Sequence, residues 1–287
     1  MDSLRLHQVL SSLEQMFPAD TAQSWDRVGL VTGDPEQPIR RIHAAVDPTL
    51  EVIEEARAAG ADLLITHHPL LLRGVHSVAT TSAKGAAVTS LVVGDVALYV
   101  AHTNADVAEP GVNTALATAC GLTETEPLTI EEGRPMGRIG DLAEPVSLAD
   151  FAARLAQALP SAPAGIRVAG PADGQVRRVA LLGGAGDGLI DAAAAAGADV
   201  YVTSDLRHHP VLEAREDAAR TGGTPFLIDA GHWATESLWL EEMLGRLGES
   251  VAAAGHDVIG LETHVSTICT DPWSFIVGAR PDLGDPQ

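Results

Sequence analysis

Two adjacent histidines, His67 and His68, follow an apolar run that begins at Leu63 and ends at Thr66. The run predicts a short buried strand, and Pro69 prevents its regular continuation. Open α/β sheets carry their functional groups beyond the carboxyl ends of strands, so imidazoles here can bind metal, transfer protons or cap the chain. Adjacent residues of a strand point to opposite faces, so one ion does not easily bind both histidines. Two neighbouring ions remain as an interpretation beside a core or capping role.

A histidine and a glutamate one helical turn apart, His232 and Glu236, form a second group. In steps of four residues they extend the apolar stripe of a long predicted helix, which consists of Leu240, Met243, Leu244 and Leu247. A buried carboxylate is costly unless it is paired, and a metal ion is an effective partner. The alternative is that this first turn lies in solvent and that Glu236 only stabilises the helix N-terminus.

A third polar group, His102 and Asp106, follows an apolar run at 96–101 that predicts another strand. Asp106 precedes a predicted helix, so it can either cap that helix or bridge two metal ions. We expect His102 to hydrogen-bond to a metal ligand rather than to bind metal itself. His102 and His209 are the candidates for proton transfer, although the doublet His208-His209 is otherwise predicted to be structural.

The three groups together predict a metal centre more strongly than any one of them. The candidate ligands are His67, His68, Asp106, His232 and Glu236. Imidazoles mixed with carboxylates favour Zn, Mn, Fe, Co or Ni over Ca or a thiolate site. Two divalent ions with these two carboxylates would leave a local charge of about +2, which suits a small anionic substrate. Paired ions about 3.5–4 Å apart activate water and stabilise developing negative charge, which is the chemistry of a hydrolase.

The elements around these groups recur in the two halves of the chain. The sequence Ala-Ala-Gly-Ala-Asp occurs at 58–62 and again at 195–199, each time between a predicted helix and a predicted strand. We predict two similar α/β domains with mixed sheets flanked by helices, with the metal site between them at the carboxyl ends of strands. The expected domains are residues 1–125 and 126–225. The C-terminal segment 226–287 is expected to pack back on the first domain and to complete the metal site.

Other stretches give more local expectations. The middle of the chain, about 122–175, is rich in Pro, Gly and Glu and predicts a linker, interrupted by a helix that a capping box starts at Ser147. Late strands are predicted at 258–261 and 274–277. The glycines of 183–188 have GxGxG spacing instead of the GxGxxG of dinucleotide sites, so we expect a tight turn before a helix and no NAD site.

Composition limits the class of protein. The net charge is −21, with 39 acidic and 18 basic residues among 287, which argues against a nucleic-acid-binding surface. No apolar run approaches the roughly 18 residues of a membrane span, and the first residues lack the pattern of a signal peptide. Cys120 and Cys269 fit free thiols in a reducing compartment. We therefore expect a cytoplasmic protein without membrane or nucleic-acid partners.

Five blocks, in this order along the chain, give it a resemblance to the GTP cyclohydrolase 1 type 2 homologue family, also called Nif-three-like dinuclear metal-centre proteins. The blocks are Trp25-Asp26-Arg27-Val28-Gly29-Leu30, Ile65-Thr66-His67-His68-Pro69-Leu70, His102-Thr103-Asn104-Ala105-Asp106, Thr203-Ser204-Asp205-Leu206 and Asp229-Ala230-Gly231-His232-Trp233-Ala234-Thr235-Glu236. Arg27 replaces the usual Asn of the family and Ser204 the usual Gly. Neither substitution falls on a candidate ligand.

The resemblance implies two similar α/β domains in a toroidal homohexamer whose two-metal centres face the interior. By motif match, the metal ligands of the family fall on His67, His68, Asp106, His232 and Glu236. The length of 287 residues corresponds to the short form, without the domain that larger relatives carry in the middle. The implied activity is metal-dependent hydrolysis, GTP cyclohydrolase-like or on another nucleotide or phosphoester. The alternative is a non-enzymatic, metal-binding or regulatory hexameric assembly.

Overall fold

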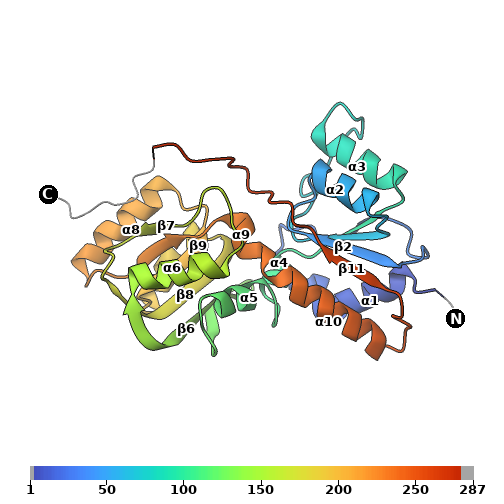
Figure 1. The fold of residues 1–287 in the computed structure, drawn as a ribbon. Helices are drawn as coiled ribbons and strands as arrows, with labels where there is room; N and C mark the ends of the chain where they lie inside the picture. Colours follow the sequence, from blue (N-terminus) through green and yellow to red (C-terminus); the bar gives the residue numbers. More distant parts are fainter. Residues whose placement is uncertain (1–2, 279–287) are drawn as a thin grey trace.

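The computed structural model describes residues 3–278, which form two α/β halves (Figure 1). Each half contains one mixed sheet. The first sheet has the order β1-β4-β3-β2-β11, formed by β1 (Gly29–Thr32), β2 (Arg41–Ala45), β3 (Leu63–Thr66), β4 (Ala97–Val100) and β11 (Glu262–Val265). The second has the order β5-β6-β8-β9-β10-β7, formed by β5 (Glu126–Glu131), β6 (Arg134–Ser147), β7 (Arg167–Ala169), β8 (Gln175–Ala185), β9 (Val200–Ser204) and β10 (Phe226–Asp229). The predicted fold class is confirmed.

Helices cover both faces of the first sheet. One face packs against α1 (Leu6–Met16) and α10 (Trp239–Ala253), and the other packs against α2 (Leu50–Ala58) and α3 (Ala83–Val93). Strands β2, β3, β4 and β11 run parallel, and only β1 is antiparallel to its neighbour β4. The carboxyl ends of β3 and β4 therefore meet at the same edge of the sheet.

The second sheet is also covered on both faces. One face packs against α5 (Val112–Ala119), α6 (Leu148–Ala158) and α9 (His232–Ser237), and the other packs against α7 (Ile190–Ala195) and α8 (His208–Arg220). Strands β8, β9 and β10 are parallel, whereas the outer strands are antiparallel to their neighbours. The chain then returns to the first half, because α10 packs on the first sheet and β11 pairs with β2.

One pair of aspartates confirms the predicted internal repeat. Asp62 accepts hydrogen bonds from the backbone N–H groups of Arg40 and Arg41, at 2.7 and 3.0 Å. In the second half, Asp199 accepts the same pair of bonds from two consecutive residues of β8, each at 2.8 Å. Both aspartates end the Ala-Ala-Gly-Ala-Asp sequence, so each repeat makes the same pair of hydrogen bonds to a central strand of its sheet.

The linker expected in the middle of the chain is wrong. Residues 126–147 form the hairpin β5–β6, and β6 pairs with β8 inside the second sheet. The two turn residues, Glu132 and Gly133, have φ of 47° and 78°, which is why a glycine occurs there. Prolines and charged residues are tolerated because β5 is an edge strand. The predicted cap of α6 is confirmed, since the Ser147 hydroxyl accepts the Asp150 N–H at 3.1 Å.

The two late strands are also misplaced. Residues 258–261 and 274–277 contain no strand, and the strand in this region is β11. Its residues are mostly polar because β11 lies at the sheet edge, so hydrophobicity did not reveal it. Beyond β11, the C-terminal segment (residues 266–278) crosses from the first half to the second in an extended form (Figure 1).

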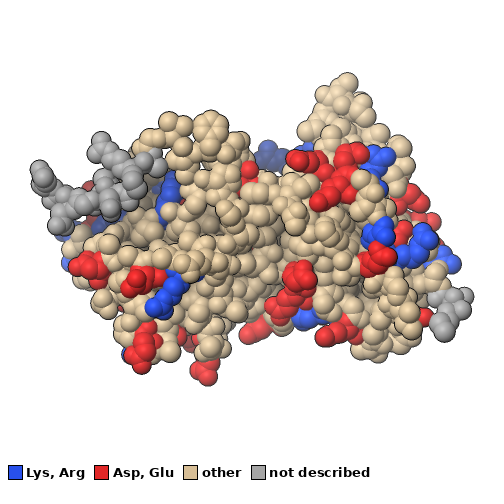
Figure 2. Space-filling view, viewed as in Figure 1, with Lys and Arg blue, Asp and Glu red and all other residues tan. Residues whose placement is uncertain are grey.

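The surface reflects the acidic composition. On the face shown in Figure 2, acidic side chains lie on both halves and many basic ones are adjacent to them. Within residues 3–278, no helix has the combination of length and hydrophobicity that crossing a bilayer requires.

Candidate metal centre

All five candidate ligands meet where the two halves of the molecule adjoin. His67 and His68 directly follow β3, and Asp106 ends the short helix α4 (Thr103–Asp106) after β4. His232 and Glu236 belong to α9, which follows β10 of the second sheet. The residues His68, Asp106, His232 and Glu236 line a common cavity of about 440 Å³. The structure thus brings together side chains that are up to 169 positions apart, as a site between two α/β units requires.

Glu236 lies at the centre of the group, and its side chain is only 4% exposed. Its Oε1 atom is 3.4 Å from Nε2 of His67 and 3.0 Å from Nε2 of His232. Its Oε2 atom is 3.1 Å from Nε2 of His68. The one-turn spacing between His232 and Glu236 places both on the same side of α9, as the helical stripe predicts. Each oxygen of this carboxylate therefore has its own imidazole neighbour.

Aspartate carboxylates orient two of the imidazoles by hydrogen-bonding to Nδ1, the ring nitrogen that faces away from Glu236. His68 makes a hydrogen bond of 2.7 Å from Nδ1 to Asp47, and His232 makes one of 2.8 Å from Nδ1 to Asp205. A carboxylate at Nδ1 holds the ring so that Nε2 faces the cavity, which is the usual arrangement behind a metal-binding histidine. The sequence did not identify Asp47 or Asp205 for this role.

His67 is oriented by the backbone. Its Nδ1 lies 3.0 Å from the carbonyl oxygen of Ala101, and because a carbonyl only accepts, Nδ1 carries the proton. Its Nε2 atom faces Oε1 of Glu236 at 3.4 Å and Oδ1 of Asp106 at 3.7 Å. A ring nitrogen and two carboxylate oxygens thus converge in a buried space, where a proton or a metal ion between them would satisfy their polar atoms.

Three buried atoms in this space have no hydrogen bond of good geometry, although one of them, Oε2 of Glu236, lies 3.1 Å from Nε2 of His68. They are Nε2 of His67, Oδ1 of Asp106 and Oε2 of Glu236. Native proteins rarely leave buried polar atoms unsatisfied, and each of these is a common metal-ligand atom. The residues present therefore fit metal ions, and the His and Glu groups of the site are able to hold them.

The electrostatics of the cluster are dominated by mutual stabilisation of opposite charges. Burial alone would raise the pKa of Glu236, but His67 and His68 outweigh it and hold the pKa well below the ordinary value. Burial would lower the pKa of His68 and His232, yet the neighbouring carboxylates raise these values to about 10 and about 11. Burial raises the pKa of Asp106, although His67 acts in the opposite direction. Without metal, protons on the imidazoles supply the positive charge that the carboxylates require.

His102 lies beside the candidate ligands and is itself oriented by a carboxylate. Its Nδ1 is 2.9 Å from Asp26, and its ring centroid lies 5.0 Å from that of His67 and 5.4 Å from that of His68. The Trp25 ring meets it edge-on at 5.7 Å. Asp26 thus holds His102 as Asp47 holds His68, which explains the Trp25-Asp26 block of the sequence. The predicted hydrogen bond of His102 to a candidate ligand does not occur, and His102 instead forms a group with His67 and His68 that could itself hold an ion.

The glycine-rich stretch 183–188 forms one wall of the cavity. Gly184 has a φ of 68°, and a Cβ at this position would lie only 2.1 Å from Oε1 of Glu236. Glycine is therefore required for the close approach of β8 to the carboxylate. The glycine spacing indicated a turn, but it gave no sign of this contact.

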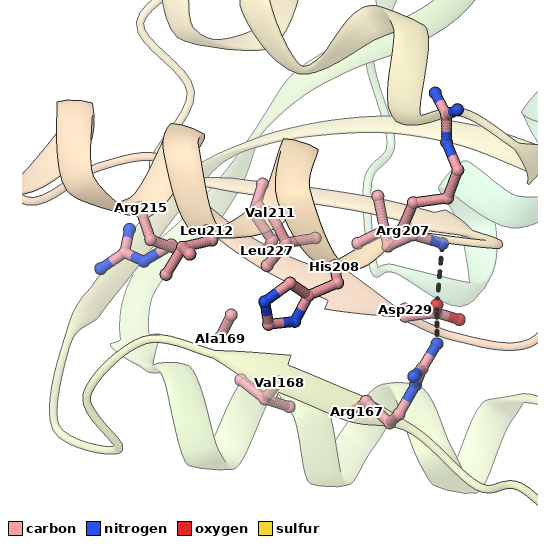
Figure 3. A pocket seen from close by; sticks show the side chains of 11 residues that line it. Arg167, Val168, Ala169, Arg207, His208, Val211, Leu212, Arg215, Leu227 and Asp229 are labelled. Atoms are coloured by element: carbon pink, nitrogen blue, oxygen red, sulfur yellow. Dashed lines mark hydrogen bonds and ion pairs between the residues drawn. The ribbon is translucent and has the colours of Figure 1, made fainter.

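His209 lies on α8, where its ring centroid is 5.2 Å from that of His208, and it does not line the cavity of the metal centre. A separate cavity of about 400 Å³ occurs between α8 and β7 (Figure 3). Its walls are mainly apolar, and Arg167 at one end forms an ion pair with Asp229. Its lining includes His208 but none of the five candidate ligands.

The family model described as DUF34/NIF3 (NGG1p interacting factor 3) matches residues 4–272. The chain belongs to the DUF34/NIF3 family. A relative from Streptomyces coelicolor, named "GTP cyclohydrolase 1 type 2 homolog", is 46% identical over 96% of each chain. A protein of the same name from Mycobacterium tuberculosis is 33% identical in an alignment of 382 positions. That alignment is longer than this chain of 287 residues, so the mycobacterial relative carries inserted residues.

Solved structures of other proteins share this fold. A Bacillus cereus protein related to NIF3 has a TM-score of 0.85 and 28% identity, covering 96% of this chain and all of its own. Reduced HcgD from Methanocaldococcus jannaschii has a TM-score of 0.73 and 28% identity, covering 92% of this chain and 98% of its own. The predicted family and its two-unit architecture are confirmed by these similarities.

Proposed function

We propose that this DUF34/NIF3 chain binds two divalent transition-metal ions at the centre formed by its two halves. The ligands would be His67, His68, Asp106, His232 and Glu236. The observation that carries the proposal is Glu236, whose two oxygens each face a different imidazole across distances of 3.0–3.4 Å. A carboxylate in that position can serve two ions at once. The mixed nitrogen and oxygen donors suit Zn, Mn, Fe, Co or Ni.

We further propose that the centre belongs to a metal-dependent hydrolase. Two bound ions would supply Lewis-acid activation of water and stabilisation of developing negative charge. His102 would transfer a proton at Nε2, because Asp26 holds Nδ1. His209 is a weaker candidate for this role, since it does not line the cavity.

The substrate class follows from the cavity. A volume of about 440 Å³ suits a small molecule, and the described lining contains no lysine or arginine. An anionic group would therefore be held by the metal ions themselves. GTP is the first substrate to test, because the relatives are named GTP cyclohydrolase 1 type 2 homologs. Other nucleotides and phosphoesters come next.

The test is turnover by protein loaded with one metal at a time, measured against protein treated with a chelator. We expect hydrolysis that disappears with the chelator, returns with one divalent metal and is absent in Glu236→Ala. No turnover of GTP, other nucleotides or phosphoesters by fully metal-loaded protein would contradict the hydrolase proposal. The metal content of the same samples separates failure of catalysis from failure of binding.

One observation favours a second candidate, a non-enzymatic metal-binding or regulatory assembly. The described cavity lining provides metal-binding groups but no lysine, arginine, serine or cysteine. A site that only holds or senses ions needs none of these. This candidate predicts that metal changes the binding of a protein partner without any turnover.

We also propose a homo-oligomer, a toroidal hexamer by family resemblance. The C-terminal segment exposes apolar side chains that are costly in water, including Phe275 at 77% and Val277 at 82%. Light scattering should give a mass near six times 29.8 kDa. A mass of one chain at micromolar concentration would contradict the assembly.

A further inference from the structure

A second group of metal-ligating side chains lies on the first sheet and uses none of the residues above. β11 pairs in parallel with β2, and this register places His264 beside His43 with ring centroids 4.8 Å apart. Glu55, on α2, brings its Oε2 to 2.9 Å from Nε2 of His43. The consecutive elements β2 and α2 and the remote strand β11 thus bring two imidazoles and one carboxylate together.

His43 is the buried member of the group. Its side chain is 0% exposed, and its Nδ1 atom has no hydrogen-bond partner. Burial lowers the pKa of His43, although Glu55 acts in the opposite direction. Pairing with Glu55 alone leaves one buried nitrogen unsatisfied and does not account for the position of His264.

We propose that His43, Glu55 and His264 form a separate site for a divalent transition-metal ion of the Zn²⁺ class. One ligand atom from each residue lies within 4.8 Å of the other two. Two imidazoles and one carboxylate are a donor set that zinc uses, with bonds of about 2.0–2.2 Å. His264 is exposed and can rotate toward the ion, and solvent on that side provides the fourth ligand.

The site would attach residues 266–278, which follow β11, to the first sheet. Ser266 follows β11 and donates its hydroxyl to Oε2 of Glu55 at 2.5 Å. Further along, the Thr270 hydroxyl lies 2.5 Å from Asp47, the carboxylate that orients His68. An ion held by two strands and one helix would thus fix the segment that reaches the residues behind the main centre.

The test uses full-length protein depleted of metal, with Zn²⁺ alone as the probe. We expect wild type to bind about one more Zn²⁺ per chain than His264→Ala. Zn²⁺ should also slow hydrogen exchange in β11 of wild type and not of this variant. His76→Ala is the matched control, because His76 is an exposed histidine in a loop and belongs to neither group. Equal Zn²⁺ content in wild type and His264→Ala would overturn the proposal.

Two further variants test whether the loss of Zn²⁺ comes from misfolding of His264→Ala or from changes at the main centre. Glu55→Gln preserves the shape of the side chain and should also lose the additional ion, so it replaces His264→Ala if that variant does not fold. Glu236→Ala should lose ions of the main centre and keep the Zn²⁺-dependent protection of β11. If Glu236→Ala loses that protection as well, the effect comes from the main centre and the second site is refuted.

Discussion

The Nε2 atoms of His68 and His232 lie 3.2 Å apart, although the two residues are separated by 164 positions in the chain. Each ring is held at Nδ1 by a different aspartate, so neither can turn its other nitrogen away without losing that bond. Two nitrogens this close cannot both present lone pairs, so at least one of them must carry a proton or bind a metal ion. This relationship makes the interface between the two halves of the DUF34/NIF3 chain the place where metal chemistry is expected.

Replacement of Glu236 by alanine should lower the metal content from about two ions per chain to one or none, because a bridging carboxylate serves both ions. Elemental analysis of purified protein measures this directly. Glu249→Ala is the control, since Glu249 is an exposed glutamate on the adjacent helix α10. Unchanged metal content in Glu236→Ala would remove this residue from the centre.

Replacement of Asp205 by asparagine should weaken metal binding about 10- to 100-fold, because His232 would lose the charged partner that fixes its orientation. Competition with a chromophoric chelator gives the dissociation constants. Asp191→Asn, at an exposed position of α7, should bind metal like wild type. If the two variants have the same affinity, the Asp205 contact contributes nothing to the site.

Metal should remove the loss of stability that metal-free protein shows as the pH rises. In metal-free protein the pKa values of His68 and His232 are raised to about 10 and about 11 from 6.5. A raised folded-state pKa adds stability that is complete below pH 6.5 and is lost as the pH rises through the raised values. Metal binding needs neutral imidazoles, so the stability gained from metal grows as the pH rises.

The Tm of metal-free and metal-saturated protein, measured from pH 6.5 to about 9.5, tests this prediction. The difference between the two Tm values should widen with pH. A pH indicator in weakly buffered solution should also report proton release when metal is added at neutral pH. Two parallel curves and no proton release would show that these histidines do not bind the metal.

Replacement of Gly184 by alanine should reduce both metal content and stability. The new Cβ would lie 2.1 Å from Oε1 of Glu236, and the left-handed backbone alone costs about 1–2 kcal/mol with a side chain. Denaturant unfolding and elemental analysis measure the two effects. Gly188→Ala is matched to it, because Gly188 belongs to the same glycine-rich stretch but has no atom within 4 Å of a new Cβ. Equal metal content and equal free energies of unfolding in Gly184→Ala and Gly188→Ala would argue against this contact.

The local parts of the fold and site could be predicted from sequence periodicity. The strand before His67 and the one-turn spacing of His232 and Glu236 are short-range patterns, and both occur in the structure. The single long helix predicted from His232 is wrong, because α9 ends at Ser237 and a separate helix, α10, begins at Trp239. The repeated Asp62 and Asp199 likewise indicated two related units. Each of these features depends on residues within a few turns or one strand, where backbone geometry decides which side chains share a face.

The partners of the histidines could not be predicted in the same way. Asp47 and Asp205 reach their imidazoles only after the strands are paired and the helices are packed. The pairing of β11 with β2 joins residues 221 positions apart, and its polar edge strand has no hydrophobic pattern. Hairpin β5–β6 was missed because its prolines and charges are typical both of loops and of exposed edge strands.

The route of the chain has a consequence for biosynthesis. The centre draws three side chains from the first sheet and its neighbouring helix and two from α9, which follows the last parallel strand of the second sheet. On the ribosome, His67 and His68 are translated long before Glu236, and α10 and β11, which complete the first α/β unit, are translated after it. If the centre holds two ions as proposed, a nascent chain cannot hold both until synthesis is nearly complete, and metal would be acquired after both units have formed.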